Sequence, residues 1–231
     1  MGYKYSAMNA EILYTPLDIN LELPDEKKII DWVVEHRIKD TNYNQYQINW
    51  NIHCPIVSCF PIEDWTSSNA IVELDKHIHK LHNTGTLYWH PGFKETFPEI
   101  AAAIEQLPFQ ELTVAIIQTQ IGYIRPHQDD LDDIASTITE PRRFFIHLTD
   151  PTKTTLFLCK DEHGTDSITP RIRKEWPCYA FNNDTAWHGA TKGDTVRMII
   201  NTAGIIDPLK HKELIDRSLT KFKDEVLYVD L

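Results

Sequence analysis

Residues 112–127, LTVAIIQTQIGYIRPH, form a β-rich run that leads through Arg125-Pro126-His127 to Gln128-Asp129. The run is rich in β-branched and apolar residues, a composition that favours a strand. In an extended segment, residues two apart project to the same face, so His127 and Asp129 are expected to point together. The sequence therefore predicts a strand that brings an imidazole and a carboxylate to one place.

Similar short runs continue along the C-terminal half of the chain and indicate its fold class. They are separated by Pro, Gly, Asp and Asn, which are typical of turns. Such a series predicts a compact β-sandwich or barrel, and the overall class is expected to be mainly β with flanking helices. The runs are RRFFIHLTD (142–150), TTLFLCKD (154–161), CYAFNND (178–184) and TVRMIINTAGIID (195–207).

The chain of 231 residues is expected to form a single domain with three parts. Residues 1–110 are predicted to be a helical and irregular support, residues 111–207 the β-barrel catalytic core, and residues 208–231 a helix that packs on the core. Within the support, the spacing predicts a strand at 11–17, a helix opened by Leu23-Pro24-Asp25, irregular strands over 43–62, and helices over 67–81 and 95–107.

Composition disfavours several classes of partner. Acidic residues outnumber basic ones 34 to 23, and the basic residues are scattered, so nucleic acid is not an expected partner. The longest apolar runs are far shorter than the roughly 20 residues of a membrane-spanning helix, so a soluble protein is expected. The four cysteines form no Cys-x-x-Cys pair and no secretory signal is visible, which favours reduced thiols and a cytoplasmic location.

A third metal ligand is expected at His188. This residue lies beside Gly189 at a predicted strand end, and two histidines with one carboxylate on one face of a metal are typical of iron(II) oxygenases. Arg197 follows nine positions later. If the chain returns as a hairpin through TKGD (191–194), Arg197 comes back alongside the metal pocket and points inward, where a buried guanidinium requires an anion.

The order of these motifs resembles the 2-oxoglutarate and iron(II)-dependent dioxygenases. His-x-Asp at 127–129 is followed by RFFIHL (143–148), then by Phe-Asn-Asn (181–183) with His188 downstream, then by Arg197. Within that family the sequence looks most like the aspartyl/asparaginyl β-hydroxylase-like branch, which includes free-proline hydroxylases. The resemblance covers about residues 112–207 and implies a double-stranded β-helix core of jelly-roll or cupin type.

The resemblance also implies roles for named residues. Fe(II) would be held by His127, Asp129 and His188, and Arg197 would pair with the distal carboxylate of 2-oxoglutarate, a contact that suits a guanidinium. His147 matches a histidine that lies near this cosubstrate in the branch, and Arg143 is a candidate second clamp because Phe145 stands where the branch often has arginine. Gln118, on the strand leading to His127, is a further candidate contact.

The expected function is therefore hydroxylation of a C–H bond in an amino acid or a peptide side chain, with O2 consumed and succinate and CO2 released. Two alternatives use the same three ligands. One is a non-oxidative, cupin-type ligand-binding protein, and the other is a zinc hydrolase that keeps one coordination position for water. Arg197 disfavours the binding protein, because a metal site alone has no need of a buried cation.

Overall fold

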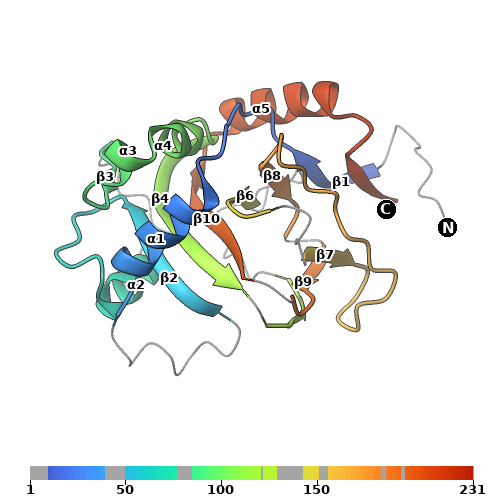
Figure 1. Cartoon of the computed structure of the whole chain (residues 1–231). Helices are drawn as coiled ribbons and strands as arrows, with labels where there is room; N and C mark the ends of the chain where they lie inside the picture. The colour runs from blue at the N-terminus through green and yellow to red at the C-terminus, as the bar shows by residue number, and fades with distance from the viewer. Residues whose placement is uncertain are drawn as a thin grey trace.

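The computed structural model describes residues 10–39, 50–76, 85–120, 122–128, 143–150, 156–183, 186–193 and 196–230. Within them, two antiparallel β-sheets pack against each other and helices cover the larger sheet (Figure 1). The protein is mainly β with flanking helices, as the sequence predicted. None of the helices in the described part of the chain combines the length and apolar character required to cross a bilayer.

The larger sheet has eight strands in the order β11-β1-β8-β6-β10-β4-β2-β3. The two long strands β4 and β10 pair along their length in the middle of this sheet. The bounds are β1 Ala10–Pro16, β2 Trp50–Ser58, β3 Tyr88–Trp89, β4 Phe109–Gln120, β6 Arg143–His147, β8 Cys178–Phe181, β10 Arg197–Ile206 and β11 Leu227–Asp230.

The smaller sheet has three strands, β5 (Ile124–His127), β9 (Trp187–Ala190) and β7 (Leu156–Cys159), in the order β5-β9-β7. From β4 to β10, successive strands alternate between the larger and the smaller sheet. This winding is that of a double-stranded β-helix, or jelly roll, and it confirms the predicted core.

Side-chain alternation gives the larger sheet two different faces. Phe144, Ile146 and Ile200 belong to the main core on its helix-covered side. Phe145 and Ile199, their neighbours in sequence, belong to a second apolar cluster that includes residues of the smaller sheet. Because side chains on a strand point alternately to opposite faces, the same parity sends Arg143 of β6 and Arg197 and Asn201 of β10 toward the space between the sheets.

Helices α1, α4 and α5 close the outer face, since Ile29, Ile100 and Leu214 all join the main core. Helix α2 packs in a separate cluster on Val114 and Ile116 of β4, which alternate with the main-core residues of that strand and so lie on its other face. N-terminal capping residues explain where two of these helices begin, since the carboxylates of Asp25 and Asp207 cap α1 and α5. The bounds are α1 Glu26–His36, α2 Ser68–Asp75, α3 Phe93–Thr96, α4 Pro98–Glu105 and α5 Pro208–Lys221.

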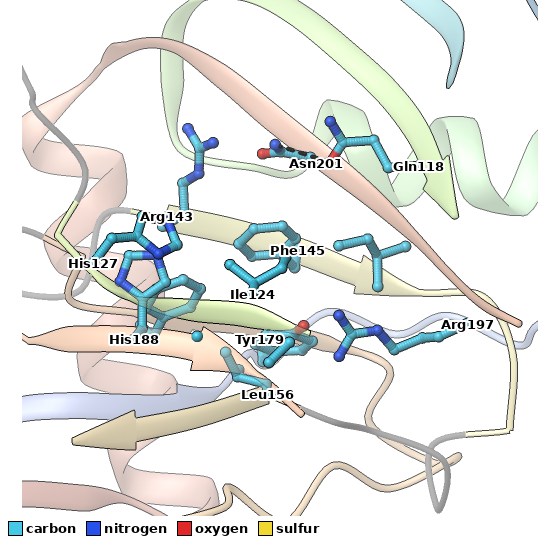
Figure 2. Close-up of a pocket in the computed structure, with 14 residues that line it drawn as sticks. Gln118, Ile124, His127, Arg143, Phe145, Leu156, Tyr179, His188, Arg197 and Asn201 are labelled. Carbon is cyan, nitrogen blue, oxygen red and sulfur yellow. Dashed lines mark hydrogen bonds between the residues drawn. The ribbon is translucent and has the colours of Figure 1, made fainter. Parts of the chain in front are cut away.

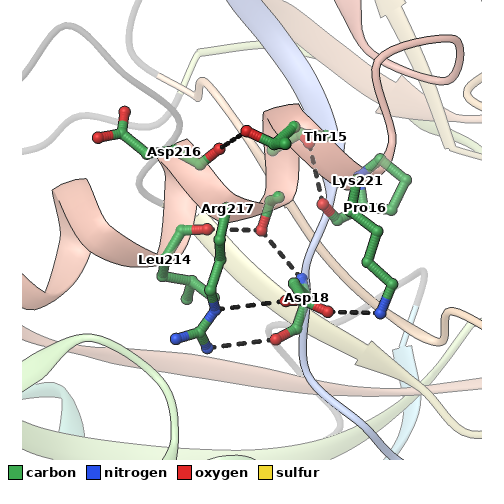
Figure 3. Close-up of polar contacts among 9 residues, drawn as sticks. Thr15, Pro16, Asp18, Leu214, Asp216, Arg217 and Lys221 are labelled. Carbon is green, nitrogen blue, oxygen red and sulfur yellow. Dashed lines mark hydrogen bonds and ion pairs between the residues drawn. The ribbon is translucent and has the colours of Figure 1, made fainter.

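Polar contacts around Asp18 join the C-terminal helix α5 to the segment that follows β1 (Figure 3). The Asp18 main-chain N–H donates to Ser218 Oγ over 2.9 Å, and Arg217 Nη2 donates to the Asp18 carbonyl over 3.2 Å. The Asp18 carboxylate pairs with Lys221 and lies 3.7 Å from Arg217 Nε. These contacts hold α5 beside β1, next to the apolar face that Leu214 and Ile215 bury.

The strands expected at 11–17 and over 43–62 are confirmed as β1 and β2, and both belong to the larger sheet. Two other expectations need correction. The C-terminal helix ends at Lys221, and the chain then adds β11 against β1, because the helical spacing of the tail continues past the residue where the backbone turns. Strands β9 and β10 form no hairpin, since they lie in different sheets. The predicted division into support, core and C-terminal helix stays a prediction.

Gly204→Ala is expected to destabilise the fold. Gly204 pairs with Leu112 at a bulge, and a Cβ there would lie 2.3 Å from the Glu111 carbonyl oxygen and 2.8 Å from the Thr113 nitrogen. Because these obstacles are main-chain atoms of the central strand pair, we expect a loss of about 1–3 kcal/mol in the free energy of unfolding, measured with denaturant. Leu209→Ala, at a side chain 81% exposed, is the control and should change it by less than about 0.5 kcal/mol.

Candidate functional site

A cavity of about 150 Å³ lies between the two sheets (Figure 2). Its walls come from both sheets, and Phe145, Phe181 and Ile199 supply much of the apolar surface. Polar side chains enter from several strands, so the cavity combines a water-poor wall with a few fixed donors and acceptors, as ligand sites commonly do. The polar residues are Gln118, His127, Arg143, Tyr179, His188, Arg197 and Asn201.

The structure brings His127 and His188 together, as predicted. They face each other as a cross-strand pair between β5 and β9, and their ring centroids are 4.3 Å apart. Gly189 makes this close pairing possible. A Cβ at Gly189 would lie 2.6 Å from both the Ile124 carbonyl oxygen and the Phe157 ring. His188 is 7% exposed, so one of the pair is held in a largely dry setting.

Main-chain carbonyls orient both imidazoles in the same way. Nδ1 of His127 lies 3.0 Å from the carbonyl oxygen of Arg125, and Nδ1 of His188 lies 3.3 Å from that of Ala186. A hydrogen bond to a carbonyl requires the proton on Nδ1, which places the lone pair of each ring on Nε2. Metal-binding histidines are commonly fixed in this manner, so the donor set fits a divalent metal.

The predicted carboxylate ligand, Asp129, lies outside the described residues. Among the residues that are described, no group of three or more His, Cys, Asp and Glu side chains is placed to hold a metal ion. Two of the three predicted ligands are therefore adjacent, and the complete ligand set stays a prediction.

Arg197 lines the same cavity from the first position of β10 and is 5% exposed. Its Nε has no hydrogen-bond partner, and no carboxylate among the described residues forms an ion pair with it. Burial lowers the pKa of the Arg197 guanidinium. Burial also raises the pKa of the neighbouring Tyr179 to about 12, and the charge of Arg197 opposes this rise in part. A charged group in this setting requires an anionic partner. Arg197 reaches the cavity by a crossing between sheets, not by the predicted hairpin.

The other predicted cosubstrate contacts lie in different positions. Arg143 and Gln118 line the cavity, and Gln118 accepts a hydrogen bond of 3.3 Å from Asn201. His147 is fully buried and is not among the cavity's lining residues. Burial, and secondly the charge of Arg197, lower the pKa of His147 to about 3, so its ring is neutral at physiological pH. The roles of all three stay predictions.

Two polar lining residues, Tyr179 and Asn201, were not foreseen from the sequence. Tyr179 lies in CYAF (178–181), where every residue is buried, and Asn201 lies within an apolar run on β10. Strands buried on both faces show no alternation of polar and apolar residues. Only the pairing of β8 with β6, and of β10 with β4, assigns these side chains to the inner face.

No family model matches the chain, and no curated protein matches it. Among solved structures, 47 chains match, and one of them is a prolyl-4-hydroxylase from Pseudomonas putida. That protein is 10% identical in sequence with a TM-score of 0.38, and the alignment covers 82% of this chain and 93% of that chain. A likeness this distant does not indicate function, so function has to be argued from the residues of the cavity.

Acid is expected to destabilise the fold through its buried neutral histidines. Burial lowers the pKa of His147 to about 3 and that of His53 to about 4, so below about pH 6.5 the unfolded chain binds protons that the folded chain does not. The contribution of these histidines to stability is therefore complete above about pH 6.5 and falls as the pH is lowered, by at most about 1.4 kcal/mol per pH unit for each histidine, until about pH 4 for His53 and about pH 3 for His147.

His147→Gln should remove one histidine's share of this slope. Urea unfolding of the variant and the wild type at pH 7, 6 and 5 measures it, and His53→Gln gives an independent second case. Equal slopes in the wild type and in both variants would contradict the assignment of neutral, buried imidazoles.

Proposed function

We propose that this protein is a 2-oxoglutarate and iron(II)-dependent oxygenase that hydroxylates a C–H bond of an amino acid or a peptide side chain. The observation that carries the proposal is Arg197, a buried guanidinium with no acidic partner among the described residues, in the same cavity as the His127 and His188 pair. A site that combines a metal with a fixed cation suits an anionic molecule that also binds the metal.

The metal end of the proposal depends on the donor set. The two imidazoles present Nε2, and Asp129 lies two positions beyond His127, where the sequence predicts a carboxylate on the same face. Two nitrogens and one carboxylate leave three positions open on an octahedral metal, which suits iron(II) better than the closed site of a structural zinc.

The cosubstrate end depends on the position of Arg197. Figure 2 shows its guanidinium at the end of the cavity opposite the histidine pair, with Tyr179 beside it. A ligand that reaches both ends needs a metal-chelating group at one end and a carboxylate at the other, and 2-oxoglutarate has this form. Its distal carboxylate would offset the cost of burying the guanidinium, which favours this cosubstrate over a monoanion.

The protein's own residues orient the reactants and exclude water. Phe145, Phe181 and Ile199 form the apolar wall of the cavity, and main-chain carbonyls hold both imidazoles in one tautomer. Bound iron(II), 2-oxoglutarate and O2 would together supply the chemistry of hydroxylation: O2 is the oxidant, one of its atoms enters the C–H bond and the other enters succinate, and CO2 is released. A dry, fixed cavity restricts that chemistry to the C–H bond placed next to the metal.

Removal of a predicted ligand should abolish tight metal binding. We expect the wild-type protein to bind one Mn(II), a surrogate for iron(II), and expect His127→Ala, Asp129→Ala and His188→Ala each to weaken binding by at least about 100-fold, because even second-sphere changes cost 10- to 100-fold. Calorimetry measures this. His163→Ala, on an exposed side chain, is the control and should bind as the wild type does. Stoichiometric, unweakened binding in the ligand variants would contradict the metal site.

Arg197→Met should separate cosubstrate binding from metal binding. Methionine keeps an unbranched side chain but removes the charge, and the loss of a buried charge pair typically costs about 2–5 kcal/mol, so affinity for 2-oxoglutarate should fall by roughly 30-fold or more. Mn(II) affinity should stay within about threefold. Titration of 2-oxoglutarate into the Mn(II) complex by calorimetry tests both.

Arg37→Met is the matched control, because Arg37 is exposed at the end of α1 and does not line the cavity. It should leave both affinities unchanged. If Arg197→Met binds 2-oxoglutarate as the wild type does, the oxygenase proposal loses its main support and a cupin-type binding protein becomes the better interpretation. Metal-dependent hydrolysis without any 2-oxoglutarate affinity would favour the zinc alternative.

A further inference from the structure

Arg197 is the first residue of its strand, and strand ends open more readily than strand centres. The neighbouring strand β6 ends at His147, which pairs with Ile199. Beyond that pair, the Leu148 N–H donates to the Met198 carbonyl over 2.9 Å. A regular antiparallel pair of residues exchanges two main-chain bonds, so the Met198 N–H would be expected to return a bond to the Leu148 carbonyl.

A side-chain hydroxyl takes the place of that main-chain acceptor. The Met198 N–H donates to Thr149 Oγ1 over 3.2 Å, and both residues are buried. A buried N–H that lacks an acceptor costs free energy comparable to a lost hydrogen bond, so this contact is not readily given up. The Thr149 hydroxyl therefore fixes the main chain at the residue next to Arg197.

His147 holds this hydroxyl in place. Its Nε2 lies 3.5 Å from Thr149 Oγ1, since residues two apart in an extended segment project to the same face. Burial lowers the pKa of His147 to about 3, so the ring is neutral and can accept the hydroxyl proton while the hydroxyl oxygen accepts the Met198 N–H. The contacts thus run from the imidazole through the hydroxyl to the main chain of β10.

The direction of Arg197 matters for its binding partner. A guanidinium binds a carboxylate best through two parallel hydrogen bonds, and this geometry tolerates little rotation. The Nε of Arg197 has no hydrogen-bond partner, so the direction of the side chain depends on its packing and on the main chain from which it starts. Support for that main chain is therefore support for the anion site.

We propose that Thr149, held by His147, is a positioning residue for the cosubstrate: its hydroxyl sets the direction of Arg197 and does not touch 2-oxoglutarate. The proposal rests on the proposed function, since it assigns Arg197 to the distal carboxylate of 2-oxoglutarate. It gives His147 an indirect role in place of the direct contact expected from the sequence. The cavity lining supports this, because it includes Arg197 but neither His147 nor Thr149.

Thr149→Val keeps the branched shape of the side chain and removes the hydroxyl. We expect it to lower the affinity of the Mn(II) complex for 2-oxoglutarate by about 10-fold, because the Met198 N–H loses its acceptor and Arg197 loses its fixed direction. Mn(II) affinity should stay within about threefold of the wild-type value. Thr149→Ser keeps the hydroxyl and should bind 2-oxoglutarate within about threefold of the wild type. Calorimetry measures both affinities.

Thr202→Val is the matched control for stability. Thr202 is also a buried threonine, and its Oγ1 donates to the Phe144 carbonyl over 3.0 Å, so it too links β10 to β6, but five residues from Arg197. This variant should lose stability to denaturant much as Thr149→Val does and should keep its affinity for 2-oxoglutarate. An equal loss of 2-oxoglutarate affinity in both variants would reduce Thr149 to a purely structural role and overturn the proposal.

Hydrogen exchange tests the geometry without any cosubstrate. The Met198 amide should exchange at least about 10-fold faster in Thr149→Val than in the wild type, whereas Thr149→Ser and Thr202→Val should leave its protection unchanged. Unchanged protection of this amide in Thr149→Val would remove the hydroxyl bond on which the proposal depends.

The indirect role of His147 is tested by combining substitutions. His147→Leu should weaken 2-oxoglutarate binding by less than Thr149→Val does, and the double variant should bind within about twofold of Thr149→Val, because both changes act on one hydroxyl. Losses that add up in the double variant would mean that His147 contacts the cosubstrate itself, and would overturn its role through Thr149.

The outcomes separate this proposal from the one on which it rests. If the wild-type protein and Thr149→Val bind 2-oxoglutarate equally well, the positioning role is overturned and the oxygenase proposal stays intact. A wild-type protein that does not bind 2-oxoglutarate would contradict both.

Discussion

Strand β10 lies between β6 and β4, and its register with both strands determines which side chains reach the cavity. A shift of one residue would turn Arg197, Ile199 and Asn201 toward the helices and place Met198 and Ile200 in the cavity. That alternative is costly, because it would bury a guanidinium in the main core and expose apolar side chains to a polar site. The long pairing of β10 with β4 holds this register.

The winding of the chain between the two sheets supplies the second half of the site. Strands β5 and β9 of the smaller sheet carry His127 and His188, whereas the larger sheet carries both arginines. A ligand that contacts the histidines and Arg197 therefore bridges the sheets. Arg197 is 5% exposed in a predominantly apolar layer, so its charge requires an anionic partner at that end of the cavity.

Sequence reasoning identified the β-rich core, because it depends on local patterns, and it named His127 and His188 through the order of motifs along the chain; their pairing across β5 and β9 came only from the structure. It also identified Arg197 as an inward-facing residue, although by a wrong hairpin. The route was wrong because β9 and β10 are close in sequence but lie in different sheets, and no local pattern encodes a crossing. Contacts that depend on distant pairing were equally hidden, such as the position of β1 beside β8 and of β11 beside β1.

Side-chain direction in fully buried strands was the other limit. Phe144, Phe145 and Ile146 are all apolar, so their sequence does not tell which of them faces the cavity. The same is true of Tyr179 on β8, whose side chain can be assigned to the cavity only once the pairing of β8 with β6 is known. For Asp129 the sequence prediction stands alone, since the residue lies outside the described part of the chain.

We propose that one molecule of 2-oxoglutarate binds to iron held by the histidine pair while its distal carboxylate pairs with Arg197. Addition of 2-oxoglutarate to the anaerobic iron(II) complex of the wild-type protein tests it most directly, because chelation of the metal by the keto acid produces a visible charge-transfer absorbance. We expect this absorbance to appear and to saturate at one equivalent of 2-oxoglutarate per protein. An iron complex whose absorbance is unchanged by excess 2-oxoglutarate would contradict it.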